Sequence, residues 1–175
     1  MALTIQDVRQ DFRPQRNYEW ELSILPAGSP IGEEPLISQR IESHNIPSVE
    51  NETIEINYKS QKTFHVGRDS SPHTFSVTLW DGEDGAIYRF FRNWRETGMS
   101  NSLFGGGLQR DVYATDAILR FYEHDSQTMT IAHRWGIVFP ISVGEISANY
   151  SESSLVTFDV TFSYDWHLIG EDAGY

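Results

Sequence analysis

Apolar and polar residues alternate with a period of two along most of the chain, a pattern typical of strands with one buried face. The clearest segments have as inward-facing residues Tyr18, Trp20, Leu22 and Ile24; Ile54, Ile56 and Tyr58; Phe75, Val77 and Leu79; and Val156, Phe158, Val160, Phe162 and Tyr164. A shorter strand is predicted over 144–150. Residues 116–123 and 128–138 predict two further strands, joined by a hairpin loop between them.

Residues 84–96 depart from this alternation and predict an amphipathic helix. The apolar residues there recur at i, i+3, i+4 and i+7 and form one stripe: Ile87, Phe90, Phe91 and Trp94. Asp81 or Asp84 is expected to cap the start of the helix, and Gly98 to end it.

Residues 36–64 are expected to form another hairpin, with residues 45–52 near its tip. Pro47 favours a loop or an edge strand, because proline cannot donate a backbone hydrogen bond within a sheet. Residues 26–35 and 98–109 have the Gly and Pro content of loops.

Together these patterns predict a mainly β fold of seven or eight antiparallel strands and one helix. A β-barrel or β-sandwich with the helix packed against its flank is the expected architecture, because it buries every apolar face. A length of 175 residues fits a single domain over 1–175, with its core at about 13–166.

The charge balance limits the classes of partner. The formal net charge is −12, from 25 acidic and 13 basic residues, which argues against a protein that grips nucleic-acid phosphates or an anionic membrane. The absence of cysteine excludes disulfides and thiolate chemistry. Without a signal peptide or an apolar run long enough to cross a bilayer, the chain is expected in the cytoplasm.

No arrangement of residues predicts catalysis. The histidines show no metal-binding spacing and are expected to be isolated: His44, His65, His73, His124, His133 and His167. Acidic pairs on strand faces are expected to be solvated, and the glycines at 105–107 lack the Gly-Lys-Ser/Thr of a phosphate-binding loop. We therefore expect no enzyme activity, no catalytic residue, no metal and no cofactor. A monomeric β-barrel enzyme or ligand-binding protein is the alternative of another class.

Several segments carry a resemblance to a known family. Residues 13–22 combine an Arg-Pro dipeptide with the first strand. Residues 73–80 lead through an acidic loop to a helix that ends in Asn93-Trp94. Residues 135–146 combine an aromatic residue, a proline and a glycine turn, and the Phe-x-Val strand at 156–165 follows them. In order and spacing these segments resemble the tail tube proteins of contractile-tailed bacteriophages, which are related in fold to type VI secretion tube subunits.

The resemblance implies a structural virion protein that forms stacked hexameric rings, through which DNA passes during ejection without specific binding. Tail sheath, baseplate and tape-measure proteins are the implied partners, with assembly in the host cytoplasm. Alternatives within the same fold are the tube subunit of a contractile injection or type VI secretion system, and a baseplate or terminal tube ring.

The resemblance also gives three residue groups an expected role. Glu19, Glu21, Glu145 and Asp159 lie on polar strand faces and are candidates for a lumen wall that repels phosphates. An inter-ring hairpin at about 45–64 would include Asn45, Pro47, Glu50 and Glu52. Arg89, Arg92 and Arg95 are either a contact to an acidic patch on a neighbouring copy or a solvated helix face.

Overall fold

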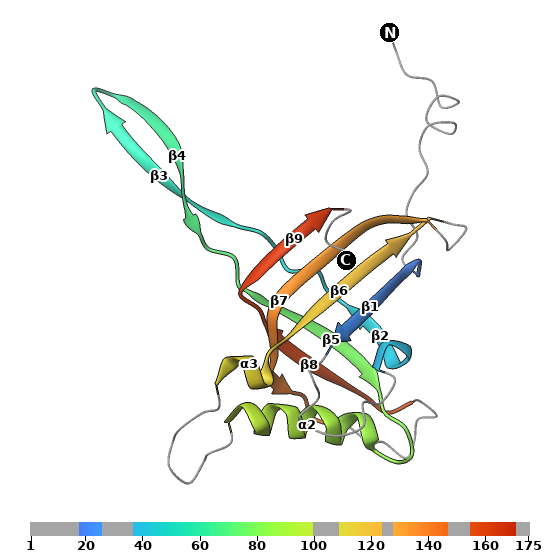
Figure 1. The fold of residues 1–175 in the computed structure, drawn as a ribbon. Coiled ribbons are helices and arrows are strands. Elements are labelled where there is room, and N and C mark those ends of the chain that lie inside the picture. Colours follow the sequence, from blue (N-terminus) through green and yellow to red (C-terminus); the bar gives the residue numbers. More distant parts are fainter. Residues whose placement is uncertain (1–17, 26–36, 100–108, 124–127, 147–154, 171–175) are drawn as a thin grey trace, which may run out of the picture.

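Two antiparallel sheets that share one long strand make up most of the molecule. The computed structural model describes residues 18–25, 37–99, 109–123, 128–146 and 155–170. The elements in chain order are β1 (Trp20–Leu25), η1 (Ile37–Arg40), β2 (Ile41–His44), β3 (Asn51–Tyr58), β4 (Gln61–Asp69), β5 (Thr74–Trp80), α2 (Ala86–Met99), α3 (Arg110–Tyr113), β6 (Thr115–Tyr122), β7 (Met129–Val143), β8 (Thr157–Ser163) and β9 (Trp166–Gly170) (Figure 1).

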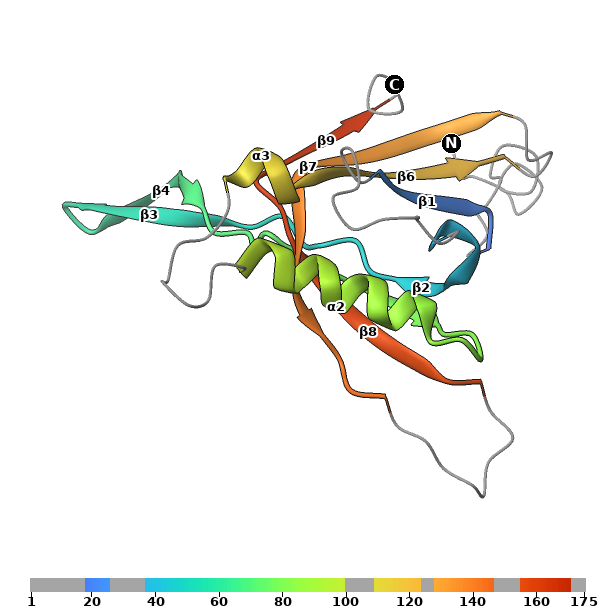
Figure 2. The same ribbon diagram turned by 60° about the horizontal axis from the view of Figure 1, so that its bottom comes forward.

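The shared strand is β7. Its first part pairs with β6 and β9, giving the order β1-β6-β7-β9 that we call sheet A. Its last residues pair with β8, giving the order β7-β8-β5-β2 that we call sheet B. Figure 2 shows β7 turning sharply from one sheet into the other. The turn coincides with a positive φ of 59° at Ile137, an uncommon conformation for a β-branched residue.

The core lies between the inner faces of the two sheets. Leu22, Leu119 and Trp135 face inward from sheet A, while Phe75 and Phe162 face them from sheet B, and all five are at most 2% exposed. The rings of Phe75 and Trp135 stack with centroids 4.9 Å apart. The alternation in β1, β5 and β8 therefore predicted buried faces correctly, except that Tyr18 and Val156 at their ends are exposed.

Helix α2 lies across the sheets near the turn of β7 (Figure 1). The predicted apolar stripe is buried: Ile87, Phe90, Phe91 and Trp94. Both predicted capping residues act at the helix start, since Asp84 Oδ1 accepts from the amide of Ala86 and Asp81 Oδ1 accepts from the amide of Ile87, each at 3.3 Å. Gly98 does not end the helix, which continues to Met99. No helix in the described ranges is long and apolar enough to cross a membrane.

The hairpin of β3 and β4 projects away from both sheets (Figure 1). The predicted location of its tip is wrong: the turn lies at Lys59 and Ser60, whose φ angles of 45° and 72° suit a two-residue hairpin turn. Residues 45–52 lie at its base instead, where the amide of Ser70 donates to the carbonyl of Glu50 at 2.9 Å.

Some other predictions differ from the structure, and some lie outside the described residues. Residues 144–146 are not a strand, and the remainder of the strand predicted over 144–150 lies outside the described residues. The loops predicted over 26–35 and around 100–108 also lie outside them. The short elements η1, β2, α3 and β9 were not predicted, and the described ranges hold nine strands rather than seven or eight.

Candidate functional site and assembly surfaces

The face of sheet A turned away from the core is the first candidate surface. Strand pairing places Glu21 opposite Arg120, and Arg134 opposite Leu168, so these side chains share one face across four strands. We call this the outer face of sheet A, and it consists of Glu21, Ser23, Asp116, Ile118, Arg120, Tyr122, Ala132, Arg134, Gly136, Trp166 and Leu168.

The outer face carries charges of both signs, since Glu21 and Asp116 lie among Arg120 and Arg134. The Arg134 Nη2 and Nε atoms lie 2.6 and 3.2 Å from Asp116 Oδ2, and the two side chains are about one-third exposed. The Tyr122 hydroxyl donates to Glu21 Oε2 at 2.9 Å, and burial together with this hydrogen bond raises the pKa of Tyr122. The face is therefore a mixed-charge surface rather than a uniformly acidic one.

Sheet A has two edges, β1 and β9, each of which pairs on only one side among the described strands. β9 exposes large apolar side chains: Trp166 at 37%, Leu168 at 55% and Ile169 at 56%. An uncovered strand edge with apolar side chains is a template for pairing with another chain. Sequence analysis missed β9, because its five residues do not alternate between apolar and polar.

The four acidic residues predicted to line a lumen are divided between two surfaces. Glu21 lies on the outer face of sheet A, with Glu19 just before β1. Asp159 lies on β8, where its Oδ1 accepts from Thr78 Oγ1 at 2.7 Å, and Glu145 follows the end of β7 in sheet B. Alternation identifies the polar face of each strand, but it does not tell which sheet the strand joins.

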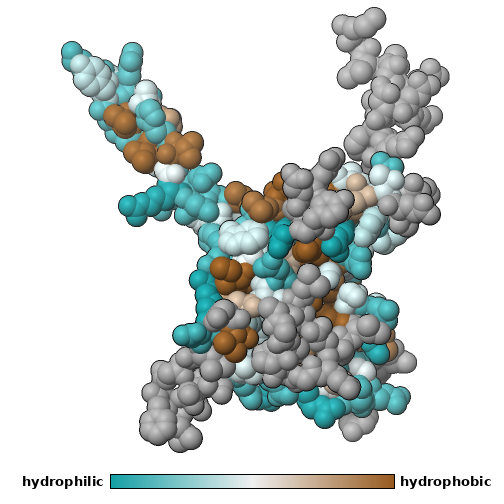
Figure 3. Space-filling view, in the orientation of Figure 1, coloured by the Kyte–Doolittle hydropathy of each residue, from teal (hydrophilic) through white to brown (hydrophobic). Residues whose placement is uncertain are grey.

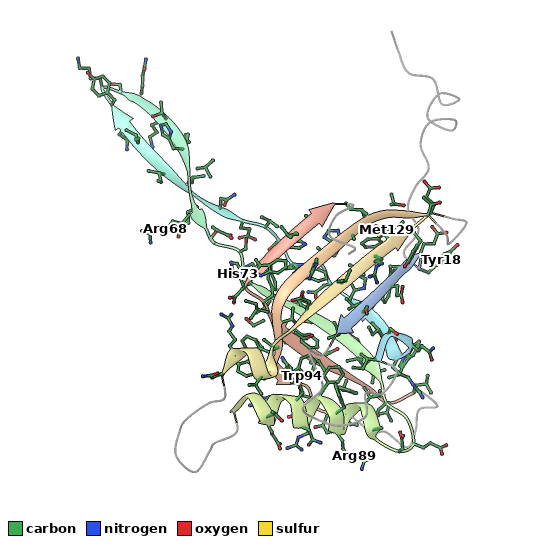
Figure 4. All side chains as sticks on the ribbon, viewed as in Figure 1. Tyr18, Arg68, His73, Arg89, Trp94 and Met129 are labelled. Atoms are coloured by element: carbon green, nitrogen blue, oxygen red, sulfur yellow. The ribbon has the colours of Figure 1, made fainter. Side chains whose placement is uncertain are left out.

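The projecting hairpin is apolar on both faces. Strand register places Ile54, Ile56 and Tyr58 on one face, while Phe64 and Val66 lie on the other. These side chains are 49–77% exposed, and Figure 3 shows apolar surface along the hairpin. Arg68 and His73 mark the base of the hairpin in Figure 4. The base lies close to sheet B, and the exposed apolar side chains lie further out along the hairpin.

The base of the hairpin holds the residues that were predicted as its tip. The side chain of Asn45 accepts from the amide of Ser76 on β5 at 2.6 Å, while the amide of Glu50 donates to Ser71 Oγ at 3.0 Å. Pro47 lies between them in a segment without regular structure, and Glu52 is on β3. Asn45 therefore ties the base to sheet B, and the four residues lie near the base rather than at the tip.

The three arginines of α2 all have partners within the chain. Arg89 donates to two backbone carbonyls just before the helix and lies on the side away from the sheets (Figure 4). Arg92 Nη2 lies 3.4 Å from Glu96 Oε1, and Arg95 Nε donates to the carbonyl of Ile141 at 3.3 Å. Arg92 is well exposed, so the solvated-face interpretation and a contact to a neighbouring copy both stay open.

The prediction that the histidines are isolated is wrong for His133 and His167. His133 Nδ1 and His167 Nε2 lie 3.1 Å apart between β7 and β9, although 34 residues separate them in the chain. His65 lies on the exposed hairpin, whereas His73 pairs with Asp69 at 3.5 Å. In the described part of the chain, no group of three or more side chains is placed to hold a metal ion.

Comparisons with known proteins agree with this fold. The family model for phage tail tube proteins matches residues 18–170. Tail tube protein gp19 of Enterobacteria phage T4 is 27% identical over 118 residues, covering 66% of this chain and 71% of gp19. The gp19 of phage T6 is similar at 26% identity over the same length.

A solved structure of similar fold comes from the PVC extracellular contractile injection system. Its sheath/tube terminator has a TM-score of 0.67 at 13% identity, covering 91% of this chain and 99% of that chain. At that identity the likeness shows the fold alone, whereas the family model spans most of the sequence. The chain therefore belongs to the phage tail tube protein family, and its role is that of a structural component of the virion tail.

Proposed function

We propose that copies of this chain close into a ring by pairing β9 of one copy with β1 of the next. The observation that carries this proposal is the strand order of sheet A. Its four strands alternate in direction from β1 to β9, so β9 runs opposite to β1. Under rotational symmetry every junction between copies is then antiparallel, whatever the number of copies, and no strand edge of sheet A stays open.

In this ring the outer face of sheet A lines the channel, because sheet B and α2 cover its other face. Glu19 and Glu21 then lie at the wall, whereas Glu145 and Asp159 do not. The wall carries Arg120 and Arg134 as well as acids, so it presents compensated charge to a passing polyanion. We infer that DNA slides along this wall without specific binding, since few free positive charges would hold its phosphates.

The β3–β4 hairpin is the proposed contact between stacked rings. A single chain leaves Ile56 and Phe64 exposed on its two faces, and a second copy would cover them. We infer six copies per ring from the family resemblance, with sheath, baseplate and tape-measure proteins as further partners and with assembly in the host cytoplasm. Ring closure and ring stacking require no catalysis, so we infer that the chain is not an enzyme.

Engineered disulfides test the ring. The chain has no cysteine, so Leu168→Cys on β9 can be combined with Glu19→Cys just before β1, or with Glu21→Cys or Ser23→Cys on β1. Within one copy these strands are three spacings apart, about 14 Å, too far for a disulfide. Oxidation of at least one pair is expected to give a ladder of covalent oligomers that ends at the ring, with six as the expected last step.

A matched control combines Leu168→Cys with Thr161→Cys, which lies on β8 in sheet B. This pair is expected to give no ladder. Rings or hollow tubes in negative-stain electron microscopy would support the same assembly. If none of the β1 pairs forms a ladder while electron microscopy shows rings, another interface closes the ring and the edge-pairing proposal is wrong.

A tube subunit or terminal ring of a contractile injection system is the second candidate, because its fold is similar. Genes for a capsid and a terminase beside the coding sequence would favour the phage tail. A chain that stays monomeric at every concentration and binds a small molecule would instead favour the ligand-binding alternative.

A further inference from the structure

Two histidines join the edge strand β9 to the rest of the fold. The His133 and His167 rings stack with centroids 5.2 Å apart, and the nitrogen contact between them is 3.1 Å. Trp135 stacks on both rings, at 6.0 Å from His133 and 5.2 Å from His167. His133 is only 9% exposed, whereas His167 is half-buried.

Other ionisable groups face this pair from neighbouring elements. His44 on β2 approaches His133 through Phe121 of β6, with ring separations of 6.3 and 5.9 Å. The Tyr164 ring, just after β8, lies 6.3 Å from His167. Beyond Tyr164 lie His73 and Asp69.

The facing groups supply little to neutralise a charged pair. The Asp69 carboxylate already accepts from the amide and hydroxyl of Ser71 at 2.8 and 2.5 Å, and it lies 3.5 Å from His73. His44 is a third imidazole near the pair, and in its protonated form it would repel a positive charge on His133. A positive charge in the pair is therefore disfavoured both by burial and by its surroundings.

A contact between two imidazoles depends on their protonation. One neutral ring donates its N–H to the bare nitrogen of the other, so a 3.1 Å contact requires an unprotonated acceptor. When both rings are protonated, two N–H groups and two positive charges face each other across the same distance. The attraction between β7 and β9 then becomes repulsion.

Apart from this pair, β9 is attached by its antiparallel pairing with β7 and by few buried side chains. It has five residues and pairs only with β7 among the described strands. Leu168 and Ile169 are more than half exposed, so they contribute little burial. Besides the backbone pairing with β7, the strand is therefore held mainly by the side-chain contacts of His167 and Trp166.

We propose that β9 is attached to the fold by a proton-sensitive contact, so that protonation of the His133–His167 pair releases β9 from β7. Burial lowers the pKa of His133, His167 and His44 below their ordinary value of 6.5. A released β9 exposes the pair to water and restores ordinary pKa values. Release therefore binds protons, and β9 is held fully above about pH 6.5 and progressively less below it.

In the proposed ring β9 is also the edge that meets the next copy, so acid would weaken ring closure. That consequence rests on the proposed function, whereas the release of β9 within one chain does not. Each histidine that gains a proton on release changes the ratio of released to docked β9 by up to about tenfold per pH unit.

The test is an NMR titration of the full chain, at a concentration where it is monomeric, from pH 7.5 to 5. Histidine ring signals report protonation, and amide exchange, corrected for its intrinsic pH dependence, reports the opening of β9. Opening of β9 is expected to rise by about ten- to a hundredfold per pH unit below 6.5. Amides of β8, at the centre of sheet B, are expected to stay protected.

Two variants sharpen the result. His167→Gln keeps a hydrogen-bonding group but cannot be protonated, so the pH slope of β9 opening is expected to fall to about tenfold per unit or less. His65→Gln, on the exposed hairpin, is the matched control and should leave the slope unchanged. The pH slope of β9 opening tests the proposal even if His167→Gln raises β9 opening at every pH.

The proposal is overturned if β9 and β8 open together at every pH, or if His167→Gln keeps the full slope. It is also overturned if His133 and His167 titrate independently at the ordinary value while β9 stays docked. None of these results affects the disulfide test of the ring, so the two proposals fail separately.

Discussion

Gly136→Ala tests whether Trp166 is seated on sheet A as described. Gly136 lies on β7 directly opposite Trp166 of β9. A Cβ atom built at Gly136 would meet Cε2 and Cζ2 of the indole at 1.9 Å. Non-bonded carbons prefer about 3.5–4.0 Å, so the ring must move by about 2 Å, away from β7.

The size of the effect follows from how freely the indole can move. Inserting a methyl group into a packed site costs about 1–3 kcal/mol. Trp166 is 37% exposed, and its ring can swing towards solvent, which places the expected loss of unfolding free energy at the lower end of that range. Moving the ring also separates it from the Arg134 guanidinium, 5.9 Å from its centroid.

Urea unfolding of a double-mutant cycle measures this contact. Gly136→Ala is made in the wild-type chain and in a Trp166→Ala chain, and the two changes in unfolding free energy are compared. Without the indole the three nearest atoms to the added methyl group are gone, so we expect the cost to shrink by about 1 kcal/mol. An equal cost in both backgrounds would refute the reasoning, since the clash with Trp166 could not then be its origin.

Three further outcomes follow from the same structure, besides the titration of β9. Phe91→Ala, which empties a fully buried site between α2 and β8, is expected to lower the unfolding free energy by about 3–5 kcal/mol in urea or thermal unfolding. Phe64→Ser on the exposed hairpin should change that free energy by less than about 0.5 kcal/mol yet shorten tubes in electron micrographs, and tubes of normal length would contradict a stacking role. Replacing both Glu19 and Glu21 by lysine is expected to slow DNA release from assembled particles without preventing assembly, and unchanged release would count against the channel wall.

Sequence alone predicted the parts of the fold whose partners lie within the chain. Phe75, Val77 and Leu79 alternate because the core covers one face of β5, and the stripe of α2 is buried against the same core. The alternation of Ile54, Ile56 and Tyr58 looks identical in sequence, yet these side chains are exposed. Alternation of apolar residues indicates that one strand face is apolar. It does not tell whether that face is buried within the chain or left exposed on its surface.

The remaining misses have local causes. The hairpin turn at Lys59-Ser60 lacks the Asn-Gly or Asp-Gly signal that marks such turns. The tip was therefore predicted at residues 45–52, where Pro47 favours a loop. β9 is too short for a periodic signal, and it creates the His133–His167 contact only after the chain turns back beside β7. Pairing across 34 residues is a property of strand register, which no single segment encodes.

The continuity of β7 has a mechanical consequence. Its backbone belongs to sheet A at one end and to sheet B at the other, so the two sheets are linked by covalent bonds as well as by side-chain packing. A pull on β9 is transmitted to β7 by hydrogen bonds and then along one strand to β8. The two sheets therefore share tension instead of sliding past each other.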